Sequence, residues 1–228
     1  MIDQKSPSRR EYRLASLHAV AVLCLITVSS AWAGSYDDFF TAIKRDSPQQ
    51  VEMLLQRGFD PNTVDPERGE TGLILALRGD HAAIATVLMK APGINLEAKA
   101  RNGDTALMIA AIKQNKPAVE ALIALDAEVN RPGWTALHYA ASVGANEIVQ
   151  LLLDASAYID AESPNKTTPL MMAARGGHIL TVKLLLDEGA DATLKNDQGL
   201  SAIDLARKFN HVDIVDGLTY QLKRAGKM

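Results

Sequence analysis

The side chains that carry most enzyme and metal chemistry are sparse in this chain of 228 residues, which has one cysteine and five histidines. His81, His178 and His211 each occupy a turn between two expected helices. Their mutual spacing follows a long sequence period rather than a metal-binding motif. His-Glu-x-x-His, the phosphate-binding loop, the dinucleotide glycine fingerprint and the Gly-x-Ser-x-Gly elbow are all missing from the sequence. We therefore expect no catalytic residue, no metal and no cofactor, and we expect that the protein is not an enzyme.

Composition and charge exclude further classes. A content of 47% hydrophobic and 22% charged residues is that of a globular protein rather than a disordered one. The net charge of −3 provides no basic footprint, so we expect no nucleic-acid partner. One cysteine rules out a disulfide scaffold.

The first 33 residues have the pattern of a secretory signal peptide. Basic residues precede an uncharged, mostly apolar stretch from Leu14 to Val28, which is short for a membrane span. Ala31 and Ala33 then provide small side chains at the two positions that a signal peptidase reads. Arg9-Arg10 loosely resembles a twin-arginine motif, but the positions after Tyr12 fit less well, so ordinary Sec export is the default.

Cleavage after Ala33 would remove Cys24 and leave a chain without thiols, which cannot mispair in an oxidising compartment. We therefore expect a periplasmic or secreted protein with no membrane contact once the signal is cleaved. The compact signal favours a bacterial source. The alternative is that residues 14–28 are retained as a membrane anchor, so that the protein is a tethered structural adaptor.

A pattern with a period of 30 to 34 residues organises the rest of the chain. Each copy begins with a hydroxyl residue, followed by an aliphatic residue two positions later, Ala five positions later and an aliphatic Leu seventeen positions later. The five starts are Thr71, Thr105, Thr135, Thr168 and Ser201. Offsets within a copy are constant and only the connections vary in length, so each copy is predicted to be one supersecondary unit.

Each copy predicts two helices joined by a tight turn. The opening hydroxyl can accept a hydrogen bond from a backbone N–H of the first helical turn. The recurring Ala lets the two helices approach closely. Gly189 suits a left-handed position after the second helix, and Asp126 and Ser156 hold the equivalent place in two other copies. Pro117 is tolerable only in the first turn of its helix.

Two segments resemble the signature of the ankyrin repeat family. They are Gly-Trp-Thr-Ala-Leu-His-Tyr-Ala-Ala at 133–141 and Thr-Pro-Leu-Met-Met-Ala-Ala-Arg-Gly-Gly-His at 168–178. The resemblance extends from residue 36 to the C-terminus. It implies an all-α solenoid of about six helix-turn-helix units joined by β-hairpin-like loops. The implied organisation is a signal peptide at 1–33, an N-terminal capping repeat at 34–66, four central repeats at 67–197, and a C-terminal capping repeat with a tail at 198–228.

The resemblance also implies where a partner binds: on the concave face, formed by the loop fingers and the exposed positions of the first helices. The candidate partner-binding residues are Asp104, Lys113, Trp134, Tyr139, Thr167, Met172 and Arg175, with Ile109, Ile112, Ser142 and Val143 on the same face. The finger between Asn130 and Gly133 is about three residues short and is expected to leave Trp134 more open.

Trp134 and Tyr139 form the centre of the hypothesis, because Trp, Tyr and Arg lead among binding hot spots. The alternative is that both rings only cover neighbouring repeats. His138 is implied to hydrogen-bond the backbone and join adjacent repeats. The sequence thus predicts a monomeric, non-catalytic protein-interaction module whose protein partner is unidentified.

Overall fold

The computed structural model describes residues 35–227, so the signal-peptide prediction for residues 1–33 lies outside the described residues. The described chain is helical, and its helices come in pairs. After a helix over residues 35–44, the helices are α2 (Pro48–Gln56), α3 (Gly72–Arg78), α4 (Ala82–Met89), α5 (Ala106–Ile112), α6 (Lys116–Ala124), α7 (Ala136–Ser142), α8 (Asn146–Asp154), α9 (Pro169–Gly176), α10 (Ile179–Asp187), α11 (Ala202–Lys208) and α12 (Val212–Arg224).

Of the described residues, 35–59 belong to one compact unit and 60–227 belong to a second. In the first unit, the helix over residues 35–44 and α2 bury Phe39, Ile43 and Val51. The rings of Phe39 and Phe59 lie 4.6 Å apart between centroids, so an aromatic cluster closes this helix pair.

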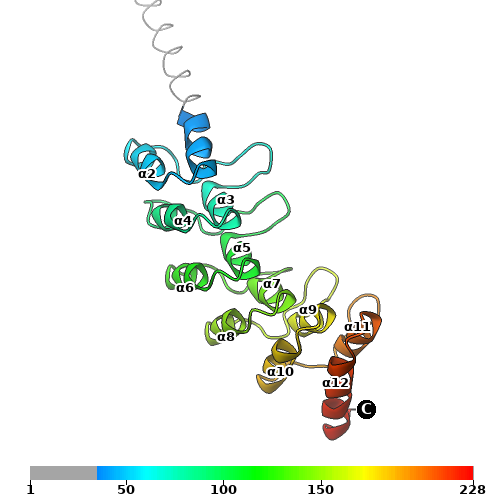
Figure 1. The fold of residues 1–228 in the computed structure, drawn as a ribbon. Coiled ribbons are helices and arrows are strands. Elements are labelled where there is room, and N and C mark those ends of the chain that lie inside the picture. Colours follow the sequence, from blue (N-terminus) through cyan, green and yellow to red (C-terminus); the bar gives the residue numbers. More distant parts are fainter. Residues whose placement is uncertain (1–34, 228) are drawn as a thin grey trace, which may run out of the picture. The chain divides into compact units, whose positions relative to one another are not determined.

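In the second unit, the first helices of successive pairs pack against one another, from α3 and α5 through to α9 and α11. The second helices α4, α6, α8 and α10 form another row beside them (Figure 1). Each pair thus buries its apolar faces against its partner helix and against the neighbouring pairs, as expected of stacked repeats.

The periodic residues occupy the core, as the sequence predicts. The Ala five positions after each start is fully buried in every pair, as is the Leu seventeen positions after it; these residues are Ala76, Ala110, Ala140, Ala173 and Ala206, and Leu88, Leu122, Leu152, Leu185 and Leu218. An Ala at the crossing of two helices lets their backbones approach, and the Leu fills the space between the second helix and its neighbours.

The capping prediction is confirmed at four starts by a direct hydroxyl bond, and at the fifth start the helix begins with a capping box. The hydroxyls of Thr71, Thr105, Thr168 and Ser201 accept from the backbone N–H three residues later. At Thr135 the capping box includes the side chain of His138, whose Nδ1 lies 3.2 Å from the Thr135 backbone N and 2.9 Å from the Thr135 hydroxyl.

The helix ends also follow the sequence. Gly189, Asp126 and Ser156 have positive φ values of 98°, 62° and 64°, which is the left-handed conformation expected after a second helix. Pro117 occupies the first turn of α6, where its missing N–H costs no intrahelical bond.

The connecting loops are less regular than β-hairpins. Between residues 35 and 227 there is one isolated antiparallel bridge, Val64 with Thr71, and no strand. Most loops are closed by a backbone hydrogen bond to the residue that precedes the hydroxyl residue of the next repeat. In one of them, Ala100 N donates to Asp104 O at 2.9 Å, and Thr105 follows. Among the described residues, the short loop at 130–133 makes no equivalent bond.

Candidate functional site

The seven candidate partner-binding residues differ in exposure. Lys113 and Arg175 are exposed, and Trp134, Tyr139 and Met172 are half-buried. Asp104 and Thr167 are only 5% and 6% exposed, so the expectation that these two side chains face a partner is wrong. Of the further positions on this face, Ile109 is also buried, whereas Ile112 is exposed and Ser142 and Val143 are half-buried.

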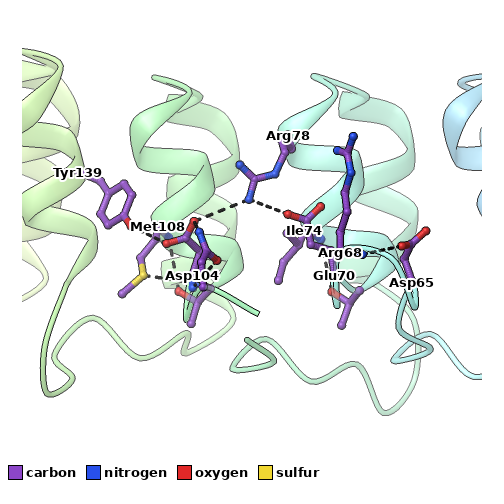
Figure 2. A network of polar contacts seen from close by, with 11 residues as sticks. Asp65, Arg68, Glu70, Ile74, Arg78, Asp104, Met108 and Tyr139 are labelled. Carbon is purple, nitrogen blue, oxygen red and sulfur yellow. Dashed lines mark hydrogen bonds and ion pairs between the residues drawn. The ribbon is translucent and has the colours of Figure 1, made fainter. Parts of the chain in front are cut away.

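Asp104 is buried because it belongs to a polar network that connects three helix pairs. Tyr139 Oη of α7 donates to Asp104 Oδ1 at 2.5 Å. Arg78 of α3 places Nη2 2.8 Å from Glu70 Oε1 and 3.7 Å from Asp104 Oδ2. Figure 2 shows Arg78 between the two carboxylates, with Tyr139 on the far side of Asp104. Glu70 Oε2 and Arg78 Nε are buried and have no partner within the described chain.

This network fixes the orientation of Tyr139. Burial, and then the bond to the Asp104 carboxylate, raises the pKa of Tyr139 above its usual value of 10, so the phenol stays neutral. Tyr139 therefore contacts the neighbouring repeat through its hydroxyl group. This contact fits the alternative that the ring covers a neighbouring repeat. Its remaining exposed edge is still part of the surface.

Thr167 is contacted by His138, the residue that the sequence analysis expected to join adjacent repeats. His138 is fully buried, and its Nε2 lies 2.8 Å from the carbonyl oxygen of Thr167 in the following loop. Its Nδ1 lies 3.2 Å from the backbone N of Thr135. Burial lowers the pKa of His138 from 6.5 to about 4, so the ring is neutral at physiological pH. The prediction that His138 bonds the backbone and joins adjacent repeats is confirmed.

Trp134 lies against this same histidine. Its indole meets the imidazole edge-on, with centroids 5.2 Å apart. One side of the indole is therefore held by His138, and the half-buried remainder faces away from that ring. Such a rigid, partly exposed aromatic group loses little conformational freedom when a partner covers it.

Two more histidines join neighbouring pairs in the turns. His178 Nε2 lies 2.9 Å from Ser142 O, and His211 Nε2 lies 3.0 Å from Arg175 O. Glycines make room for these rings: a Cβ on Gly177 would lie 2.6 Å from the His211 ring. The histidines therefore hold the turns in register.

A second set of joining residues was missed by sequence reasoning. Asn130 donates from Nδ2 to Ser156 O and accepts at Oδ1 from the backbone N of Tyr158, both at 2.7 Å. Asn62 makes the corresponding pair of bonds to Gly93 and Asn95 at 2.8 and 2.7 Å. The signal that could have found them is the Asn that recurs in the two loops, at residues 62 and 130.

The second helices carry ion pairs between neighbours. Lys116 Nζ of α6 lies 2.7 Å from Glu147 Oε2 of α8. This contact raises the pKa of Lys116 and lowers that of Glu147. Lys113, a candidate partner-binding residue, lies 2.7 Å from Asp80 Oδ2. Both pairs are solvated, so they set register more than they add stability.

Within residues 35–227, no group of three or more His, Cys, Asp or Glu side chains is arranged to hold a metal ion. The helices of this part of the chain are too short or too polar to cross a membrane.

Comparisons with known proteins agree with the geometry. The family model described as ankyrin repeats (3 copies) matches residues 39–132, 88–163 and 157–225. The human SH3 and multiple ankyrin repeat domains protein 2 is 33% identical over 166 residues, covering 71% of this chain and 9% of that protein. The human transient receptor potential cation channel subfamily A member 1 is 28% identical over 160 residues, covering 65% of this chain and 14% of that protein.

The chain thus spans only a small part of the length of these relatives. Among solved structures, the ankyrin repeat domain of Bcl-3 superposes with a TM-score of 0.66 at 27% identity. That match covers 78% of this chain and 81% of the Bcl-3 domain.

Proposed function

Because the chain belongs to the ankyrin repeat family, we propose that it is a non-catalytic protein-interaction module whose partner binds the face formed by the loops and first helices. The ankyrin repeat fold is typically non-catalytic and serves as a protein-interaction scaffold. The stacked pairs form a continuous surface, and such surfaces are suited to extended contacts with a protein.

The observation that carries this proposal is the surface around Trp134. The indole is fixed by His138 on one side and half-buried, and it sits in the loop that lacks the closing backbone bond. Met172 and Arg175 lie on α9, the first helix of the next pair. Met172 is half-buried and Arg175 is exposed. Aromatic, Met and Arg side chains are the types enriched at the centre of protein interfaces.

The binding role is tested with Trp134→Ala combined with Met172→Ala. The partner is first identified by mass spectrometry after capture from an envelope extract, then purified for titration calorimetry. Removing a buried aromatic anchor costs about 2 kcal/mol or more, so affinity falls at least about thirty-fold. The matched control, Lys223→Ala with Arg224→Ala at the end of α12, leaves affinity unchanged. Retained affinity in a folded Trp134 variant contradicts the placement of the site.

Tyr139 and Asp104 are unsuitable for that test, because their hydrogen bond contributes to the stacking of neighbouring pairs. Lys113 is available for a charged contact but is already engaged with Asp80. The partner-binding set proposed here therefore consists of Trp134, Met172 and Arg175, with the edge of Tyr139 beside them.

We also propose that the protein acts as a monomer after export, in the periplasm or outside the cell. The support is the sequence of residues 1–33, with its basic start, apolar stretch and Ala at 31 and 33. N-terminal sequencing of the exported protein should give Gly34 as the first residue. Ala33→Arg should block cleavage and leave the longer chain, whereas a retained residue 14–28 segment in the unaltered protein favours the tethered adaptor.

A further inference from the structure

Four large apolar side chains are exposed in the turns of the last two helix pairs. Ile179, Leu180, Phe209 and Val212 are 48%, 67%, 42% and 64% exposed. Ile179 and Leu180 begin α10, Val212 begins α12, and Phe209 follows α11. These four residues are called the C-terminal apolar patch below.

The fold does not require large apolar residues where the second helices begin, because the earlier helix pairs do without them. The two residues that begin the second helix are small or polar in the earlier pairs: Ala82 and Ala83, Lys116 and Pro117, and Asn146 and Glu147. All of these pairs stack in the same way. The exposed apolar residues in α10 and α12 therefore have a reason other than repeat packing.

Contacts between the turns bring the members of the patch onto one surface. His211 bonds the carbonyl of Arg175, and its ring lies against Gly177, two residues before Ile179. Val212 follows His211 directly, and α10 packs beside α12. A hollow of about 150 Å³ lies beside Val212, lined also by Arg207 and Val215.

Cations border the patch. The Arg175 guanidinium lies 5.3 Å above the centre of the Phe209 ring and has no carboxylate partner among the described residues. Lys208 is exposed beside Phe209 and is likewise unpaired within residues 35–227. A guanidinium fixed on an aromatic face retains a fork of donors that fits a carboxylate. Binding a carboxylate there would pair a charge that has no carboxylate partner among residues 35–227.

We propose that the C-terminal apolar patch, with Arg175 and Lys208, is a docking surface for a partner protein segment that carries carboxylates next to apolar side chains. This inference rests on the proposed interaction function and extends it to an adjoining surface on the turns, with Arg175 near the end of α9 belonging to both surfaces. Charge complementarity identifies the occupant. Asp213 is exposed directly after Val212, so the carboxylates of the segment are expected at the other side of the patch, beside Arg175 and Lys208.

The probes are short synthetic peptides that share a pair of leucines and differ only in two flanking residues, which are Asp, Ser or Lys. Each is titrated into the ¹⁵N-labelled chain, starting at residue 34, and followed by NMR. The Asp peptide should shift the amide signals of residues 175–180 and 207–213 and bind at least about ten-fold more tightly than the Lys peptide. Equal binding of the two peptides, or shifts elsewhere only, overturns the proposal.

Variants separate the apolar and charged contributions. Leu180→Ser with Val212→Ser should weaken the Asp peptide at least about ten-fold, whereas the matched change Ala82→Ser with Ala83→Ser, at exposed equivalent positions, should leave it unchanged. Arg175→Glu should reverse the preference, so that the Lys peptide binds more tightly than the Asp peptide. Failure of that reversal contradicts the charge assignment.

Two further assays test other occupants of the patch. Sedimentation with phosphatidylglycerol vesicles detects membrane binding, and analytical ultracentrifugation detects self-association. If the Asp peptide does not bind, and the Leu180 and Val212 changes abolish membrane binding or self-association, the peptide proposal is overturned. If the same serine variant retains full affinity for the captured native partner and the Asp peptide fails to bind, the docking surface is refuted while the interaction function stands.

Discussion

Acidification should destabilise the protein through His138, because this ring is held neutral inside the fold. Thr167 O can only accept a hydrogen bond, so the imidazole Nε2 must carry the proton that it donates. Nδ1 then has a lone pair, which accepts from the Thr135 N–H. Protonating Nδ1 would remove that acceptor and place a charge in a fully buried site.

The expected magnitude follows from the shift in pKa. The pKa of His138 falls from 6.5 in the unfolded chain to about 4 in the fold. Between these values the unfolded chain binds more protons, so the free energy of unfolding decreases as the pH falls. The contribution of neutral His138 to the free energy of unfolding is fully present above pH 6.5. It is smaller by about 2 kcal/mol at pH 5 and by about 3 kcal/mol below pH 4.

The measurement is urea denaturation followed by far-UV circular dichroism at pH 7 and at pH 5. His138→Gln replaces the imidazole N–H with an amide donor that does not titrate in this range. Between pH 7 and pH 5, the free energy of unfolding of this variant should therefore fall by about 2 kcal/mol less than that of the unaltered protein. All other titrating groups are the same in both proteins and cancel. Equal losses in the two proteins, or a His138 Cε1 NMR signal that titrates near pH 6.5, would refute the reasoning.

Three substitutions test the packing. Ala140→Leu places a larger side chain at a fully buried helix crossing and should lower the free energy of unfolding by about 1–3 kcal/mol in urea titrations; an unchanged midpoint contradicts that crossing. Gly177→Ala strains a residue at φ 77° and drives its Cβ into His211, so the melting temperature should fall, and a rise would be inconsistent with both contacts. Tyr139→Phe deletes the bond to Asp104 and should cost about 1–2 kcal/mol, whereas on a background of Asp104→Ala, which removes the acceptor, the same change should cost much less.

The core was predictable because its determinants lie within one repeat. The Ala at Ala140 and the Leu at Leu152 recur at fixed offsets, and an offset of five or seventeen residues fixes the face of a helix. The left-handed position at Gly189 follows from chain geometry alone. None of these features depends on the identity of residues in another repeat.

The binding face was only partly predictable, because exposure there depends on residues about one repeat away. Asp104 is an acidic residue in a loop, and by itself such a residue is expected to be solvated. Its burial is caused by Tyr139, 35 residues later, and by Arg78 in the preceding pair. Thr167 is covered in the same way by His138. The resemblance implied the joining role of His138, but nothing in the sequence indicated which loop residues it and Tyr139 would cover.

The repeats themselves show how to separate packing from function in this chain. Where equivalent positions are occupied alike, as at Ala140 and its counterparts, the common fold explains the residue. Where they differ although the pairs stack alike, the common fold alone does not explain the residue: Trp134 stands where two other pairs have buried Asp104 and Thr167, and Ile179 stands where another pair has Lys116. Both of these departures leave apolar surface exposed at a cost in hydration. The two surfaces proposed for binding are therefore those at which this chain departs from its own period.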